Sequence, residues 1–129
     1  MTGSAAREHA LALLYSTLSV LYAADSSAAD ELDLEGIDEW SASLARAVWA
    51  DRFQLDALIS EYAEDWRVER MPVVDRNLLR IGAYQLLDTD TPVGLIIDRA
   101  VELAKRYSTT KSGAFVNGIL DRMQERRPI

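Results

Sequence analysis

Residues 71–120 read MPVVDRNLLRIGAYQLLDTDTPVGLIIDRAVELAKRYSTTKSGAFVNGIL, and this stretch decides the fold. Apolar residues recur in it at helical spacing, in three blocks joined by two short polar segments. Pro92 suits the first turn of the second helix, and we expect Thr91 to be its N-cap. The first block is apolar over more than half of its circumference, which predicts a helix at the centre of a bundle.

The residues before this stretch also predict helices. We expect the first helix from Ser4 to about Asp25 and the second from about Asp38, with a third over the apolar residues between positions 55 and 66. Whether 51–53 breaks the second helix from the third stays open. Residues 25–38 are small, acidic and polar, so we expect a loop, with one short helix around 28–34 as an alternative. Six or seven helices with short connections predict a single all-α domain over residues 1–129.

The composition excludes several classes of protein. The chain has 129 residues and no Cys, so disulfides, thiolate metal sites and a Cys nucleophile are excluded. No apolar run approaches the roughly 20 residues that span a bilayer, so we expect no membrane contact. The first residues lack the pattern of a signal peptide, and a cytoplasmic location is expected.

The net charge of −7 is unevenly distributed along the chain. Residues 1–66 hold 3 basic and 13 acidic side chains, a net of −10, whereas residues 67–129 hold 11 basic and 8 acidic side chains, a net of +3. Overall acidity argues against a general polyanion binder. The asymmetry still allows a local basic face in the second half, although charge alone favours a solvated surface.

The sequence gives no sign of catalysis. His9 is the single His and has no predicted partner for acid–base work, so we interpret it as a surface or packing residue. Asp98 and Glu102 share one helix face and have the chemistry of a divalent-ion pair, but a solvated face is favoured because cationic residues adjoin them. No phosphate-binding Gly-rich loop or nucleophile elbow is present. We therefore predict no enzyme activity, no metal and no cofactor.

The binding signals are basic and aromatic. Arg76 and Arg80 are four residues apart, so we expect both to be exposed on one face and to contact two phosphates. For the arginines of the second half in general, the alternative is pairing with the neighbouring acids Glu69, Asp75 or Glu102. Three aromatic residues are candidates for stacking on unpaired bases, with core packing as the alternative for each: Tyr15, Tyr107 and Phe115.

Asn117 and Gly118 are poor helix formers in the middle of an otherwise strong helix. We expect Gly118 to permit the close approach of another helix. For Asn117, a packing role and a bond to a functional partner are equally supported.

Several segments together resemble the bacterial NusB family of transcription antitermination factors. The resemblance rests on DRNLLRIGAY (75–84), AVELAK (100–105) and FVNGIL (115–120), with AREHAL (6–11) through Leu14 and Tyr15 resembling the family's first helix. It covers nearly the whole chain, and residues 25–38 are its weakest part. Three ordered motifs at compatible spacings make the resemblance specific.

The resemblance implies an all-helical NusB-like fold of about seven helices in two small packed bundles, without enzyme activity. It implies binding to boxA RNA of ribosomal RNA leaders together with the small-subunit ribosomal protein NusE, within an antitermination complex on RNA polymerase. The RNA contacts of the family then correspond to Arg7, Tyr15, Arg76, Arg80, Lys111 and Phe115. Asp75 matches an acidic position near the RNA and NusE surface, and we expect partner contacts at Asp75 and Asn117.

The chain also departs from the family pattern. The family usually has several arginines before its first helix, whereas only Arg7 stands there in this chain. Each lost phosphate contact weakens RNA binding, so we expect NusE to supply more of the affinity. Two alternatives remain. One is a protein-interaction module that has lost RNA recognition; the other is kinship with the NusB-like accessory domain of ribosomal RNA cytosine methyltransferases, which requires a catalytic domain beyond Ile129.

Overall fold

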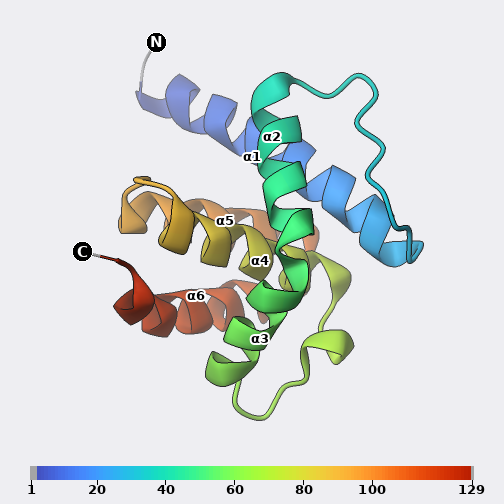
Figure 1. Ribbon diagram of the computed structural model, residues 1–129. Coiled ribbons are helices and arrows are strands. Elements are labelled where there is room, and N and C mark those ends of the chain that lie inside the picture. The colour runs from blue at the N-terminus through green and yellow to red at the C-terminus, as the bar shows by residue number, and fades with distance from the viewer. Residues whose placement is uncertain (1–2, 129) are drawn as a thin grey trace.

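The computed structural model describes residues 3–128, and their regular structure is entirely helical. This part of the chain forms six α-helices, arranged as Figure 1 shows. Their bounds are α1 Gly3–Ser26, α2 Glu39–Ala50, α3 Arg52–Tyr62, α4 Val73–Asp88, α5 Val93–Tyr107 and α6 Ser112–Met123. Two single-turn 3₁₀ helices, η1 Val68–Arg70 and η2 Gln124–Arg126, complete the described part. The all-α prediction is confirmed, and the expected count of about seven helices is close to the six α-helices observed.

Helix α4 lies at the centre of the fold, as its apolar sequence predicts. It packs against every other α-helix. Leu78, Leu79 and Leu86 are almost completely buried on it. Gly82 lets α6 approach closely, because an added Cβ would come within 2.7 Å of Leu120 Cδ1. The contact that the sequence assigned to Gly118 is therefore made at Gly82.

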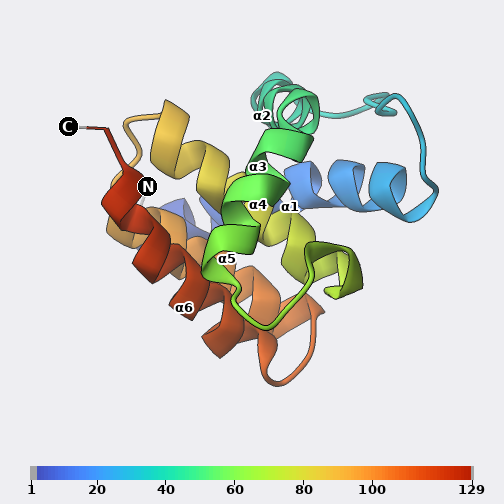
Figure 2. The same cartoon turned by 60° about the horizontal axis from the view of Figure 1, so that its bottom comes forward.

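The other helices pack around α4 in two groups. Helix α1 packs on α2, and both contact α4, whereas α5 and α6 lie side by side and cover another face of α4 (Figure 2). Helix α3 lies between these groups and contacts α4 and α6. One continuous apolar core joins all six helices. Within residues 3–128, no helix is long and apolar enough to cross a membrane.

The segment between α1 and α2 is an extended loop with turns, seen at the right of Figure 1. The alternative of a short helix around 28–34 is wrong, because Ala28 has a φ of 53° and leaves the helical region directly after α1. Leu32, Leu34 and Ile37 bind the loop to the core. The Trp49 indole also donates a hydrogen bond to the Asp30 carbonyl at 3.1 Å.

The helix ends follow the sequence signals with two exceptions, of which the first is that α3 ends at Tyr62 and does not reach residue 66. Asp38 is the N-cap of α2 and accepts a hydrogen bond from the Ser41 backbone N–H at 2.9 Å, as the predicted start requires. Asp51 separates α2 from α3, which settles the open question there. The expected N-cap at Thr91 is wrong, since Pro92 directly precedes α5 and Thr91 instead bonds Thr89.

Candidate RNA and protein interface

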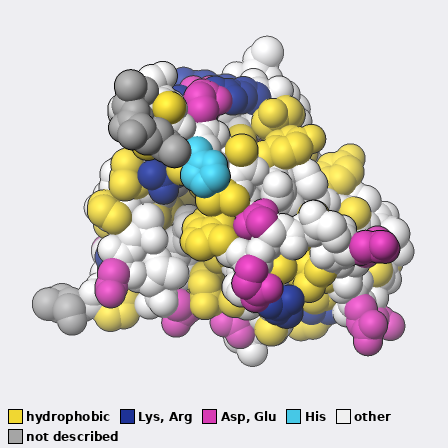
Figure 3. Space-filling model, turned by 90° about the horizontal axis from the view of Figure 1, so that it is seen from above, with side chains coloured by type: hydrophobic (Ala, Val, Ile, Leu, Met, Phe, Trp, Pro, Cys, Tyr) yellow, Lys and Arg dark blue, Asp and Glu magenta, His cyan; other side chains and the backbone are white. Residues whose placement is uncertain are grey.

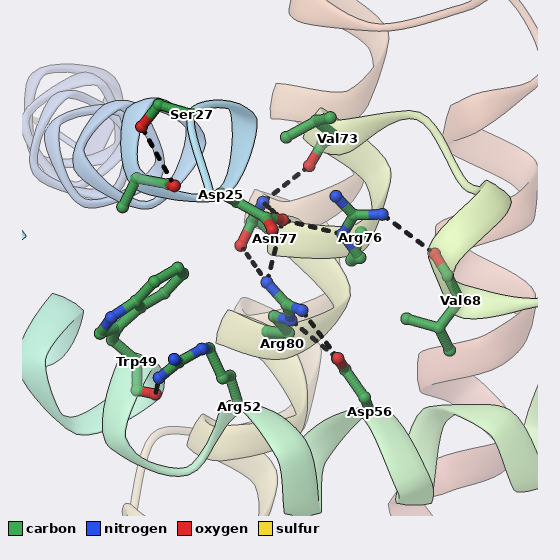
Figure 4. Close-up of polar contacts among 11 residues, drawn as sticks. Asp25, Ser27, Trp49, Arg52, Asp56, Val68, Val73, Arg76, Asn77 and Arg80 are labelled. Atoms are coloured by element: carbon green, nitrogen blue, oxygen red, sulfur yellow. Dashed lines mark hydrogen bonds and ion pairs between the residues drawn. The ribbon is translucent and has the colours of Figure 1, made fainter. Parts of the chain in front are cut away.

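Arg76 and Arg80 belong to a largely buried ion network and do not stand exposed on a helix face. We call Asp25, Asp56, Arg76, Asn77 and Arg80 the Asp25 network, shown in Figure 4. The Arg80 guanidinium binds Asp56 through two hydrogen bonds of 2.7 Å and donates to Asp25 at 3.0 Å. Arg76 Nε donates to the same Asp25 carboxylate at 2.8 Å. The network therefore connects the end of α1 to α3 and α4.

The expectation that Arg76 and Arg80 are exposed contacts is wrong. Their side chains are 12% and 5% exposed, because helices α1 and α3 close over this face of α4. Neither arginine pairs with Glu69, Asp75 or Glu102, although the alternative holds elsewhere, since Glu69 pairs with Arg67 and Glu102 with Arg106. Asp25 and Asp56 are far from both arginines in the sequence, and no spacing rule connects them.

Asn77 completes the hydrogen bonding inside the network. Its amide nitrogen donates to Asp25 and to the Val73 carbonyl, both at 2.9 Å, and its amide oxygen accepts from Arg80 at 3.0 Å. Burial opposes ionisation of Asp25, but hydrogen bonds from Arg76 and Asn77 and the charge of Arg80 outweigh it and lower the pKa of Asp25. Asp25 is thus held as an anion between two cations.

A second group of charges lies on the surface between α1 and α5. We call Arg7, Glu8, Tyr15, Asp98, Glu102, Arg106 and Tyr107 the α1–α5 edge. Arg7 pairs with Asp98 at 3.3 Å and with Glu102 at 3.2 Å. Arg106 pairs with Glu8 at 3.0 Å and lies 3.5 Å from Glu102. Glu102 is therefore shared by both arginines, and the Asp98–Glu102 pair considered for a metal holds Arg7 instead.

Two exposed tyrosines form the aromatic part of this edge. The rings of Tyr15 on α1 and Tyr107 on α5 are 4.8 Å apart between centroids and tilted by 41°. Both side chains are more than 40% exposed, so the core-packing alternative does not hold for them. An exposed ring pair beside guanidinium groups has the chemistry of a stacking platform for unpaired bases.

Lys111 and Phe115 lie farther along, at the start of α6. With Trp66, Met71 and Pro72 they line a mainly apolar pocket of about 400 Å³. Trp66 packs edge-on against Phe115, with ring centroids 6.1 Å apart, and is itself 60% exposed. Sequence reasoning did not identify Trp66 as part of the site. The sequence placed it at the end of the third helix, which is wrong, because α3 ends at Tyr62 and Trp66 lies in the irregular segment between α3 and η1.

Asp75 is buried beneath this pocket and is not a surface contact. Its carboxylate accepts hydrogen bonds from the Ser108 and Ser112 hydroxyls, the latter at 2.8 Å. These bonds fix the turn between α5 and α6 to the first turn of α4. Asp75 is only 3% exposed, and a partner contact at this residue stays a prediction. Asn117, the other expected partner residue, is exposed on α6.

The face seen in Figure 3 has no continuous basic area. Acidic side chains are scattered among hydrophobic ones, the basic areas are small, and His9 lies exposed among them. No group of three or more potential metal ligands occurs in the part of the chain that the structure describes. Cationic and aromatic groups instead gather locally, at the α1–α5 edge and at the start of α6.

These features define a small all-helical protein with a local aromatic and cationic surface. Residues 4–125 match the NusB family, and the chain belongs to that family. The transcription antitermination protein NusB of Streptomyces coelicolor is 45% identical over 93 residues, which span 71% of this chain and 66% of that protein. This match thus covers slightly less than two thirds of the relative's length.

Two solved structures have the same fold. NusB of Thermotoga maritima superposes with a TM-score of 0.78 at 38% identity and covers 92% of each chain. A structure of the antitermination factors NusB and NusE in complex with dsRNA superposes with a TM-score of 0.77, covering 92% of this chain and 98% of that one. At 22% identity, this second likeness concerns the fold alone.

Proposed function

We propose that this protein is a transcription antitermination factor that binds boxA RNA of ribosomal RNA leaders together with the ribosomal protein NusE. It acts without enzyme activity, as a scaffold within the antitermination complex on RNA polymerase. Membership of the NusB family supports this role. The observation that carries the RNA part is the exposed Tyr15–Tyr107 ring pair with Arg7 and Arg106 on the same edge.

Each of these residues has a defined role in the proposal. Tyr15 and Tyr107 stack on unpaired bases, Arg7 and Lys111 bind phosphates, and Phe115 provides an apolar wall for a further base. Arg76 and Arg80 contribute indirectly, because they fix the orientation of α1 relative to α4. Asp75 likewise acts on the RNA through the α5–α6 turn, which presents Lys111 and Phe115.

The electrostatics of the edge predict weak binding to RNA alone. Phosphates compete with Glu8, Asp98 and Glu102 for the two arginines, since each arginine already has a carboxylate partner. A hydrogen bond from Arg7 is the main cause that lowers the pKa of Glu102, and a hydrogen bond from Arg106 is the main cause that lowers the pKa of Glu8. Both glutamates therefore stay ionised. NusE therefore supplies a large share of the affinity of the ternary complex.

A titration tests this function. Labelled boxA RNA and a scrambled RNA are titrated with the protein, with and without purified NusE, at two salt concentrations. We expect preference for boxA, tighter binding with NusE and weaker binding at high salt. Absence of both RNA and NusE binding would overturn the proposal.

One observation favours a second candidate, a protein-interaction module without RNA recognition. Both arginines of the α1–α5 edge are occupied by intramolecular carboxylates. For such a module, NusE binds in the same titration while boxA and scrambled RNA behave alike.

A further inference from the structure

A hollow of about 580 Å³ lies beside the Asp25 network, between the end of α1, α3, η1 and α4. The network supplies the charged part of its lining, where side chains from three helices converge (Figure 4). We call this hollow the Asp25 pocket, and its lining residues fall into two groups. The polar ones are Asp25, Asp56, Ser60, Glu69, Arg76 and Arg80, and the apolar ones are Phe53, Ala57 and Val68.

The ion pair between Asp25 and Arg76 leaves one acceptor and one donor unused. Three N–H groups donate to Asp25 Oδ2, whereas Oδ1 has no partner within residues 3–128. Arg76 donates through Nε and Nη1, and its Nη2 has no partner in the same part of the chain. The one side-chain atom buried there without a partner is Arg127 Nη1. Asp25 Oδ1 and Arg76 Nη2 are therefore both open to solvent.

These two free groups belong to one ion pair, so they lie close together. Arg76 Nε and Asp25 Oδ2 are 2.8 Å apart, and the free atoms are the neighbours of these two. A ligand that uses both needs an N–H donor for Oδ1 and an anionic acceptor for Nη2. The ammonium and carboxylate groups of an α-amino acid, which share one carbon atom, meet this requirement.

The charges around the pocket argue against other kinds of ligand. The two carboxylates and two guanidinium groups of the Asp25 network cancel, and Glu69 adds one negative charge. A phosphate group, including that of RNA, would meet three carboxylates. A simple cation would leave Arg76 Nη2 without a partner and would approach two guanidinium groups. A neutral zwitterion avoids both repulsions.

The apolar part of the lining indicates the kind of side chain that the ligand carries. Phe53 is 70% exposed, which is unusual for an aromatic residue without a contact outside the chain. Ala57, one helical turn later on α3, is exposed beside it, and Val68 on η1 lies in the same lining. A ligand side chain that covers these groups removes apolar surface from water.

We propose that the Asp25 pocket binds a free α-amino acid with an apolar side chain. The ligand's ammonium group donates to Asp25 Oδ1, its carboxylate accepts from Arg76 Nη2, and its side chain packs on Phe53 and Ala57. The bound amino acid joins α1, α3 and α4, so it stabilises the folded protein. This site is separate from the surface proposed for RNA, and the inference does not rest on that function.

An NMR titration of the full chain with L-phenylalanine tests the proposal. We expect a dissociation constant on the order of 0.1–1 mM, as suits a ligand of this size, and shifts of the Arg76 Nε–H and Ala57 N–H resonances. L-Phenylalaninamide lacks the carboxylate and 3-phenylpropanoate lacks the ammonium group. Each should bind about tenfold more weakly, because one of the two charged groups then stays unpaired. Binding of either analogue within about twofold of L-phenylalanine would overturn the assignment of a zwitterion site.

The variant Ala57→Leu tests the location, with Ala50→Leu as its matched control. Both positions are exposed in helices, but only Ala57 lines the pocket. Both variants should unfold near the wild-type temperature, because Leu is a good helix former. Ala57→Leu should weaken L-phenylalanine binding at least fivefold by filling the pocket, whereas Ala50→Leu should bind as the wild type does. Equal binding by both variants, or no resonance shifts in the wild type, would overturn the proposal.

Discussion

The Asp25 network and the α1–α5 edge use the same side chains in opposite settings. Each has two arginines that share a carboxylate, Asp25 in the network and Glu102 at the edge. Arg80 is 5% exposed and Arg7 is 38% exposed. A buried pair that loses one partner leaves an uncompensated charge, whereas exposed partners are rehydrated. Burial therefore decides that the arginines of the network serve the fold, while those of the edge remain accessible to solvent.

Replacing Arg80 should have the largest effect. Arg80→Ala leaves Asp56 and part of the Asp25 charge without a partner, so we expect a loss of about 3–5 kcal/mol in the free energy of unfolding. Urea denaturation measures it. Arg7→Ala is the control and should leave stability nearly unchanged. A fully stable Arg80→Ala protein with weakened RNA binding would instead restore Arg80 as a phosphate contact.

Asp25 should make stability depend on pH. Its pKa is lower in the folded protein than the ordinary value of about 3.9, so its contribution is complete above that value and is lost as the pH falls through the folded pKa. Asp25→Asn should therefore be less stable than the wild type at pH 7, and the difference should shrink below about pH 4. Thermal unfolding of both proteins between pH 3 and 7 checks this. If the stability difference between the two proteins stays constant with pH, ionisation of Asp25 does not cause it.

Arg7 should matter for RNA and little for the fold. Arg7→Ala should weaken boxA binding roughly fivefold and lower the salt slope by about 0.7 for one lost phosphate contact. Binding isotherms at several salt concentrations give both numbers. An unchanged slope would mean that Arg7 stays with Asp98 and Glu102 in the complex.

Replacing Glu102 should have the smallest effect, and it should strengthen RNA binding instead of weakening it. Glu102→Gln removes the carboxylate shared by Arg7 and Arg106, so RNA binding should strengthen by about two- to threefold, a small change because the ion pairs are exposed. Competition binding against the wild type resolves a change of this size. Weaker RNA binding by the variant would show that Glu102 orients the arginines instead of competing for them.

The distance along the chain between interacting residues explains which predictions from the sequence succeeded. Helical periodicity identified all six α-helices, and the apolar circumference of residues 73–88 identified α4 as central, because both depend on neighbours three and four residues away. The pairing of Arg76 with Asp25 joins residues 51 positions apart. No local pattern carries that information, and exposure of both arginines was therefore predicted incorrectly.

Asp75 and Gly118 illustrate the same limit in the candidate site. The sequence marked both as special but did not reveal their surroundings: Asp75 lies under the α5–α6 turn, and Gly118 faces a groove with room for a side chain. Whether Arg7, Tyr15, Asp75, Lys111, Phe115 and Asn117 contact RNA or NusE stays a prediction.

The sequence by itself determined the all-helical fold, the central helix and the family, because these follow from local spacing and from motifs that are continuous in the chain. Only the tertiary structure decided which charges are buried. The packing of α1 and α3 on α4 removes Arg76 and Arg80 from water, and it leaves Arg7 and Tyr15 at the surface. Solvent access is a property of the assembled helices, and it separates the arginines that hold this protein together from those that are free to exchange partners.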